Sequence, residues 1–316
     1  MKGEFIMKKL VSLVLALLLC MSLAVPAMAE GETIAVVLKT LSSEYWNYVK
    51  AGCDAAAAEL GINVTVIGPG AESDITGQVS MIEEQLGQDI AAIVCAPNDG
   101  DAAAAALAQA TVPVLFVDTD ANLESKTAFV GTSTEDAAAI GGAYIAEKLG
   151  AEAKVVIIYG QEGENTSNMR MNGYKKALEA AGIAVLAEQS GQNTTDGAMA
   201  TMEDLLNRFP GEINAVLCHN DDTAIGAMQA CEQAGVEGVK IIGFDGNVSA
   251  VELVLEGKLE GSVAQQPYMM GYTAVASALA AAKGEAVEPI IYVDAKLVTA
   301  ENGQEYLDSL AAMLGN

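Results

Sequence analysis

Short β-rich runs alternate with stretches of helical length from residue 33 almost to the end of the chain. The predicted strands are 33–38, 62–67, 91–95, 113–117, 154–159, 183–187, 213–218, 239–243 and 259–264. The predicted helices are 44–60, 74–87, 100–110, 134–149, 167–181, 197–208, 222–234 and 247–257. Residues 264–284 predict a further helix that would pack on the first lobe, and residues 290–314 predict one more strand and a terminal helix. Repeated strand–helix–strand units form right-handed crossovers, which build parallel sheets with helices on both faces. The predicted fold class is therefore α/β.

A faint internal repeat predicts two such sheets. The segment "AAIVCAPNDGDAAAAALAQA" is followed by "VPVLFVDTD", and "NAVLCHNDDTAIGAMQACEQAG" is followed later by "VKIIGFDGN". Each copy reads strand, Asn-Asp, alanine-rich helix, strand and Asp, so Asp118 corresponds to Asp245. Ligands of open α/β sheets bind outside the carboxyl ends of the strands. A chain of 316 residues has room for two lobes, and their strand ends would face each other across a cleft.

The first 29 residues predict a secretory signal peptide and are left out of the fold. Lys8 and Lys9 precede an apolar stretch that ends in Ala-Met-Ala at 27–29, a small-x-small cleavage pattern. An uncleaved anchor and lipidation at Cys20 are the alternatives. We assign residues 30–133 and 266–294 to an N-terminal lobe and residues 134–265 and 295–316 to a C-terminal lobe. The protein is expected outside the cytoplasmic membrane, in a periplasm or at the cell surface.

Charge and motif content exclude several classes of function. The formal net charge of −26 repels nucleic acid and anionic lipid, and it suits a protein that handles neutral or cationic small molecules. The remaining cysteines, at 53, 95, 218 and 231, form no C-x-x-C pair and are expected to be buried thiols. With the single histidine, His219, they give no metal framework, so neither metal nor cofactor is expected. Motifs of hydrolases, metalloproteases, nucleotide-binding loops and dinucleotide-binding folds are missing. We predict a protein that is not an enzyme, although carboxylate chemistry stays open.

Polar residues at strand ends form a candidate binding set. Lys39, Asp118, Asn220 and Asp245 each follow an apolar run, and together they can donate to and accept from a neutral polyhydroxylated ligand. Ser43 is a candidate helix N-cap, and Tyr45 and Trp46 in the first turn could offer an aromatic face to a sugar ring. Packing of Trp46 in the core is the alternative.

Arg170 is a further candidate for binding the ligand, and it lies on a helix rather than at a strand end. Of the two arginines, Arg170 lies at the start of the helix after the first strand of the second lobe, where its planar fork could hold two hydroxyls. A surface ion pair is the alternative for Arg170. Arg208 ends a helix and is expected at the surface.

Six motifs, in order along the chain, resemble those of the periplasmic sugar-binding proteins of the ribose/allose/galactose type, the substrate-binding proteins of ABC importers. They are "IAVVLKTLSSEYW", "FVDTD", "MRMNGY", "AVLCHNDDTAIGA", "IIGFDG" and "GSVAQQPYMMG", the first being most similar to that of D-allose-binding members. The resemblance implies two Rossmann-like lobes joined by a three-segment hinge, with a pentose or hexose captured by lobe closure. It implies a membrane permease as partner, no nucleic acid, and a monomer.

The resemblance also implies which residues bind. It places Lys39, Tyr45, Trp46 and Asp118 on the first lobe's side of the ligand. On the side of the second lobe and the hinge, the resemblance places Arg170, Asn220, Asp245 and Gln265. Phe244 is a further contact that it implies. Ser43 and Asn193 complete the candidate set, and His219 is expected at the rim or in a structural role.

Three departures from the family pattern leave the ligand open. Ser43-Glu44 replaces Asn-Pro, Thr119 replaces an arginine of the ribose binders, and no aromatic stands near Asn193. A polyol, a modified sugar or a larger furanoside is compatible with these changes. A non-sugar ligand such as autoinducer-2, and a chemoreceptor or sensor partner, remain alternatives, whereas the leader and the charge argue against a LacI-type repressor core.

Overall fold

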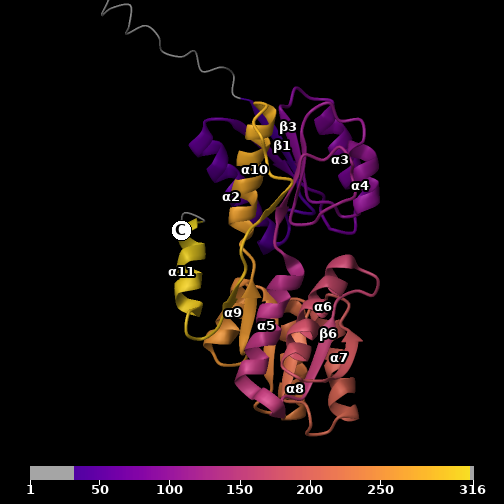
Figure 1. Ribbon diagram of the computed structural model, residues 1–316, viewed down its shortest axis with the longest axis vertical. Coiled ribbons are helices and arrows are strands. Elements are labelled where there is room, and N and C mark those ends of the chain that lie inside the picture. Colours follow the sequence, from indigo (N-terminus) through magenta and orange to yellow (C-terminus); the bar gives the residue numbers. More distant parts are fainter. Residues whose placement is uncertain (1–31, 314–316) are drawn as a thin grey trace, which may run out of the picture.

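The computed structural model describes residues 32–313, which form two α/β lobes stacked end to end (Figure 1). Each lobe is built on one six-stranded sheet, and we name the lobes by these sheets. The first lobe's sheet has the order β11-β5-β4-β3-β1-β2, and the second lobe's sheet has the order β12-β10-β9-β8-β6-β7. The predicted pair of Rossmann-like lobes is confirmed.

The first lobe's sheet is parallel throughout. Its strands are β1 (Thr33–Val37), β2 (Asn63–Ile67), β3 (Ala92–Cys95), β4 (Val114–Val117), β5 (Ala128–Gly131) and β11 (Ile290–Tyr292). Its helices are α2 (Glu44–Leu60), α3 (Ile75–Leu86), α4 (Gly100–Leu107) and α10 (Pro267–Ala282). Alternate residues of β1 enter different cores: Ile34 and Val36 pack with α2 and α10, and Ala35 and Val37 pack with α3 and α4. Burial on both faces explains why the strand reads as a continuous apolar run.

The second lobe's sheet is parallel except for its edge strand β12, which pairs antiparallel with β10. Its strands are β6 (Val155–Tyr159), β7 (Val185–Ser190), β8 (Ala215–Cys218), β9 (Lys240–Asp245), β10 (Gly261–Ala264) and β12 (Lys296–Val298). Its helices are α5 (Thr134–Leu149), α6 (Asn165–Ala180), α7 (Thr195–Arg208), α8 (Asp221–Ala234), α9 (Val248–Leu255) and α11 (Gly303–Met313), with a short 3-10 helix at Gly150–Glu152. One face of the sheet packs on α5 and α6, and the other packs on α7, α8 and α9.

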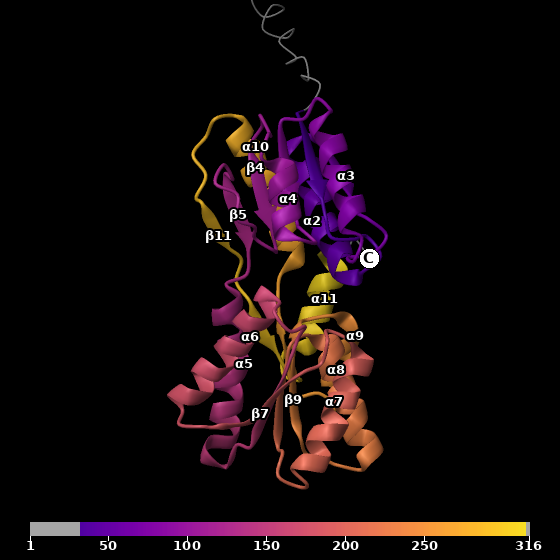
Figure 2. The same ribbon diagram turned by 90° about the vertical axis from the view of Figure 1, so that its right-hand side faces the viewer.

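The chain passes between the lobes three times within residues 32–313. It crosses from β5 to α5, returns from β10 to α10, and crosses again from β11 to β12 (Figure 2). Helix α10 packs closely on α2 because both carry glycine at the contact. A Cβ on Gly271 would overlap the Val49 carbonyl, and one on Gly52 would overlap the Tyr268 carbonyl. This packing fixes the returning segment to the first lobe.

Two features near the crossings differ from the sequence-based prediction. Strand β5 was not predicted, although all four of its residues are buried. The prediction of one strand in the last segment was wrong: β11 joins the first lobe's sheet and β12 joins the second lobe's sheet.

Two further features of the fold are the state of the cysteines and the hydropathy of the helices. Cys53, Cys95, Cys218 and Cys231 are free and buried, as predicted. Within residues 32–313 no helix combines the length and the apolar character that a membrane span requires. The predicted signal peptide at 1–29 lies outside the described residues.

Candidate functional site

A cleft of about 320 Å³ lies where the carboxyl ends of the two sheets meet. Its volume is at the small end of the range of about 300–1,000 Å³ for small-molecule sites. All the residues predicted for the site line this cleft except Phe244: Lys39, Ser43, Tyr45, Trp46, Asp118, Arg170, Asn193, Asn220, Asp245 and Gln265. Both lobes therefore contribute polar side chains to one shared cavity.

Asp118 and Asp245 occupy equivalent places in the two lobes. Asp118 directly follows β4, and Asp245 is the last residue of β9. Both have positive φ angles, 64° and 116°, which few non-glycine residues adopt. Backbone strain of this kind gathers at functional sites, where the surrounding structure holds the residue in place. In both lobes the positive φ turns the backbone at the end of a strand, at the residue whose carboxylate lines the cleft.

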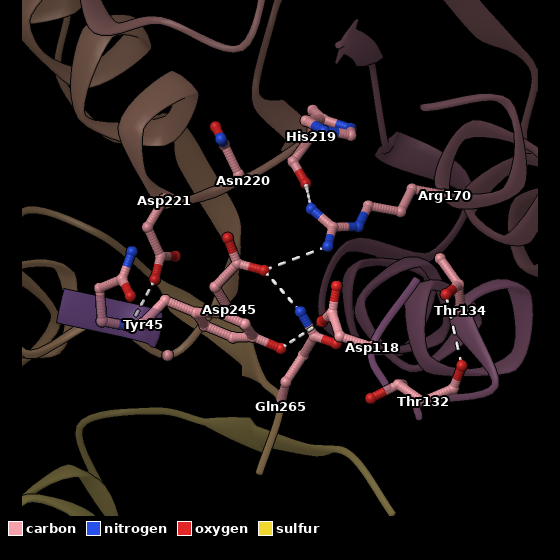
Figure 3. Close-up of polar contacts among 12 residues, drawn as sticks. Tyr45, Asp118, Thr132, Thr134, Arg170, His219, Asn220, Asp221, Asp245 and Gln265 are labelled. Atoms are coloured by element: carbon pink, nitrogen blue, oxygen red, sulfur yellow. Dashed lines mark hydrogen bonds and ion pairs between the residues drawn. The ribbon is translucent and has the colours of Figure 1, made fainter. Parts of the chain in front are cut away.

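Arg170 binds two groups of the second lobe at once (Figure 3). Its Nη1 donates to the His219 carbonyl oxygen at 2.7 Å, and its Nη2 pairs with Asp245 Oδ1 at 3.1 Å. Gln265 Nε2 donates to the same Asp245 oxygen at 2.8 Å. The Arg170 side chain is about nine-tenths buried, so the alternative of a surface ion pair is excluded.

Phe244 lies beneath this network rather than in the cleft. Its ring is fully buried, and the Arg170 guanidinium carbon lies 3.9 Å from the ring centroid. Neighbouring residues of a strand point to opposite faces, so Phe244 faces the core while Asp245 ends at the cleft. Phe244 supports Arg170 and does not line the cavity.

Burial changes the acidity of two groups at the cleft. Desolvation raises the pKa of Asp245 to about 6, while Arg170 and the hydrogen bond from Gln265 act in the opposite direction. Burial, with Arg170 and Lys39 nearby, holds the pKa of His219 well below its ordinary value, so the imidazole is neutral. Among buried atoms of the described residues, Arg170 Nε and His219 Nδ1 have no hydrogen-bond partner. No protein group of the described residues satisfies these two nitrogens.

The first lobe contributes an aromatic pair at the start of α2. Tyr45 Oη donates to Asp118 Oδ1 at 2.6 Å, and the Thr119 hydroxyl donates to Asp118 Oδ2 at 2.8 Å. Burial and the adjacent Asp118 raise the pKa of Tyr45 well above its ordinary value, so the hydroxyl remains a donor. The Tyr45 ring meets the Trp46 ring edge to face, with centroids 5.1 Å apart. Asp118 is thereby held in one orientation.

Trp46 has both of the roles that the sequence allowed, since it packs in the core and also lines the cleft. It is only 3% exposed and belongs to the first lobe's core, yet it also lines the cleft. Its indole nitrogen donates to Glu72 Oε1 at 2.7 Å, and Lys39 Nζ lies 5.9 Å from its ring centroid. Ser43 takes the predicted N-cap position of α2 without a side-chain cap hydrogen bond, which leaves its hydroxyl at the cleft.

Two asparagines shape the second lobe's side of the cleft. Asn220 caps α8 through a reciprocal pair with Thr223, in which its Oδ1 accepts from the Thr223 backbone N–H at 2.9 Å. Asn193, with a φ of 59°, accepts from the Gln161 N–H and donates to Glu164 Oε2, both at 2.8 Å. Asn193 thus orders neighbouring groups as well as lining the cavity.

Sequence reasoning missed several polar residues that line the cleft. They are Glu72, Thr119, Glu164, Thr166, Asp222 and Asn247, and His219 joins them as the expected rim residue. Glu72 lies in the loop after β2, and the others follow strand ends or lie at helix starts. Their positions after strand ends or at helix starts were the signal that the sequence offered. The sequence does not show, however, which residue of each loop points into the cleft. Within residues 32–313, no group of three or more potential ligands is arranged to hold a metal ion.

Comparison with known proteins identifies the family. A model described as periplasmic binding protein domain matches residues 34–286. The ribose import binding protein of Escherichia coli is 32% identical over 295 residues, which cover 92% of this chain and 98% of that protein.

Two solved structures resemble the whole architecture. A periplasmic solute-binding protein from Actinobacillus succinogenes with bound D-allose has a TM-score of 0.80 and 27% identity, covering 87% of this chain and 100% of the other. A solute-binding protein from Bacillus halodurans with bound myo-inositol has a TM-score of 0.77 and 30% identity, covering 88% and 98%. The match covers most of the chain and includes both lobes and the cleft between them, so this chain belongs to the periplasmic binding protein domain family, as its six motifs suggested.

Proposed function

We propose that this protein captures a monosaccharide or a related polyol in the cleft and presents it to an ABC importer. One observation carries the proposal: hydrogen-bonding groups from both lobes converge on a single cavity with an aromatic pair at its edge. Carboxylates accept from ring hydroxyls, while Arg170 Nε and Lys39 donate. The sugars named for the similar proteins support this class of ligand.

Capture would proceed by closure of the lobes around the ligand. The crossings at 131–134, 264–267 and 292–296 are short, and each joins a sheet strand to an element of the other lobe. A ligand that contacts Asp118 and Arg170 together gains contacts only when the lobes approach, so it favours the closed form. A membrane permease that recognises the closed form is the proposed partner, and the protein would act outside the cytoplasmic membrane.

We infer binding without turnover. The one histidine in the cleft is a neutral side chain whose backbone carbonyl binds Arg170, and the polar groups of the cleft are those that hold a hydroxylated guest. Mass spectrometry of a sugar recovered after long incubation should show an unchanged molecule, and a new product would contradict this inference.

A thermal-shift screen over pentoses, hexoses, polyols and autoinducer-2 would identify the ligand, and calorimetric titration would then test the site. Arg170→Lys keeps a positive charge near Asp245 but loses the planar fork. The loss of one charge-assisted hydrogen bond predicts about 10- to 100-fold weaker binding. Arg208→Lys is the matched control because Arg208 is exposed at the end of α7. Unchanged affinity in Arg170→Lys, or no stabilisation by any sugar or polyol, amino derivatives included, would contradict the proposed function.

A further inference from the structure

We propose that the ligand of the cleft carries an ammonium group, so that the preferred ligand is an amino sugar or an amino polyol rather than a neutral sugar. This inference rests on the proposed function, because it names the chemical class of ligand for the same cleft. It starts from the excess of acidic side chains around the cavity. The cleft is lined by two cationic side chains, Lys39 and Arg170, against five carboxylates, Glu72, Asp118, Glu164, Asp222 and Asp245.

The cationic side chains neutralise only part of this charge. Arg170 is committed to Asp245 by the ion pair at 3.1 Å. Lys39 lies over the Trp46 ring, and among the described residues it forms no ion pair within 4 Å. With Lys39 counted as well, the lining still carries three more carboxylates than cationic side chains.

Neutral donors hold three of these carboxylates in place. Asp118 accepts from two hydroxyls, Glu164 accepts from the Asn193 amide at 2.8 Å, and Glu72 accepts from the Trp46 indole at 2.7 Å. A neutral donor orients a carboxylate and leaves its charge in place. Fixed, partly buried negative charges in a cleft concentrate and bind cations.

Helix capping does not account for Glu164. It occupies the N-cap position of α6, but its side chain makes no hydrogen bond to the helix. The side chain instead meets Asn193, which follows β7 in another part of the lobe. Because Glu164 is half-buried beside the cleft and separate from the Arg170–Asp245 pair, we assign to it the principal contact with the ammonium group.

Two unpartnered, deeply buried nitrogens provide an independent sign that a polar ligand completes the site. Arg170 Nε and His219 Nδ1 belong to side chains that line the cleft, and these residues are 7% and 5% exposed. Arg170 Nε can only donate, so it requires a hydroxyl or ring oxygen. The His219 imidazole is neutral, so it adds no positive charge that would repel an ammonium group. The ligand is thus expected to carry oxygens toward Arg170 and its nitrogen toward Glu164.

Calorimetry with matched ligands tests the inference. The probes are D-glucosamine, D-galactosamine and inosamine, each compared with its hydroxyl parent and, for the sugars, with the uncharged N-acetyl form. An amino ligand should bind at least about tenfold more tightly than its hydroxyl parent, and the advantage should shrink as added salt screens the charges. Glu164→Gln should remove most of the advantage, measured within the variant as the ratio of its affinities for the amino ligand and for the hydroxyl parent. Glu162→Gln, an exposed neighbour outside the cleft lining, is the matched control and should keep the advantage.

The outcomes separate this inference from the function on which it rests. If the hydroxyl parents bind as tightly as the amino ligands, the inference is overturned and the proposed function stands. If an amino ligand binds preferentially but Glu164→Gln keeps the full advantage, the assignment to Glu164 is overturned. If no amino or neutral ligand binds, both the inference and the proposed function fail.

Discussion

Replacement of Arg170 by methionine should destabilise the protein by an amount that depends on pH. Arg170 donates to the His219 carbonyl and pairs with Asp245, and its side chain is about nine-tenths buried. Removing one partner of a buried ion pair leaves the other charge uncompensated, at a cost of about 3–5 kcal/mol. Near pH 8 we therefore expect the free energy of unfolding to fall by about that amount, with a decrease in Tm of about 10 °C.

The pH dependence follows from the acidity of Asp245. Its pKa of about 6 in the folded protein exceeds the ordinary value of 3.8, so protonation favours the folded state. This contribution, about 3 kcal/mol, is fully present below pH 3.8 and is lost as the pH rises through about 6. Arg170 lowers the pKa of Asp245, so its removal raises that pKa further and moves the loss to higher pH.

The deficit of the variant should therefore shrink as the pH falls. Near pH 5 a protonated Asp245 no longer needs a cation, and we expect about 1–2 kcal/mol to remain from the unpaired His219 carbonyl. Urea unfolding of wild type, Arg170→Met and the exposed-site control Arg208→Met at both pH values measures the difference. A deficit that is the same at pH 5 and pH 8, or below about 1 kcal/mol at pH 8, would refute the account of a buried, compensated Asp245.

Three further predictions concern single contacts. Tyr45→Phe removes the hydroxyl that donates to Asp118 at 2.6 Å, and urea unfolding should show a loss of about 1–2 kcal/mol; no loss would mean that this bond does not hold Asp118. Gly271→Ala forces a methyl group into the backbone of α2 and should cost about 1–3 kcal/mol, whereas Gly70→Ala, with open space around it, should be neutral in the same assay. Burial raises the pKa of the Cys95 thiol to about 12, so a thiol reagent should label it only after unfolding, and labelling of the folded protein would contradict its complete burial.

The lobes were predictable because parallel strands buried on both faces leave a strong pattern in the sequence. Runs such as 34–38 and 155–158 are apolar without interruption, and polar residues follow within a few positions. The strand-end position of Asp118 and Asp245 then led to the cleft, since the carboxyl ends of parallel strands share one edge of a sheet.

The end of the chain and part of the site were less predictable for physical reasons. In the run 290–298 no glycine or proline marks the point where the chain leaves one sheet for the other, so two short strands read as one. Glu72 and Glu164 lie in loops whose direction depends on packing with Trp46 and Asn193, residues distant in the sequence. The prediction that Phe244 contacts the ligand rested on its being next to Asp245. Neighbouring residues of a strand point to opposite faces of the sheet, so Phe244 points into the core instead.

A structure determined with the sugar or polyol identified by the thermal screen tests the central claim most directly. The account predicts one ligand between the lobes, with oxygens within hydrogen-bond distance of Arg170 Nε and of the carboxylates Asp118 and Asp245. A ligand bound to one lobe alone, or outside the cleft, would contradict it.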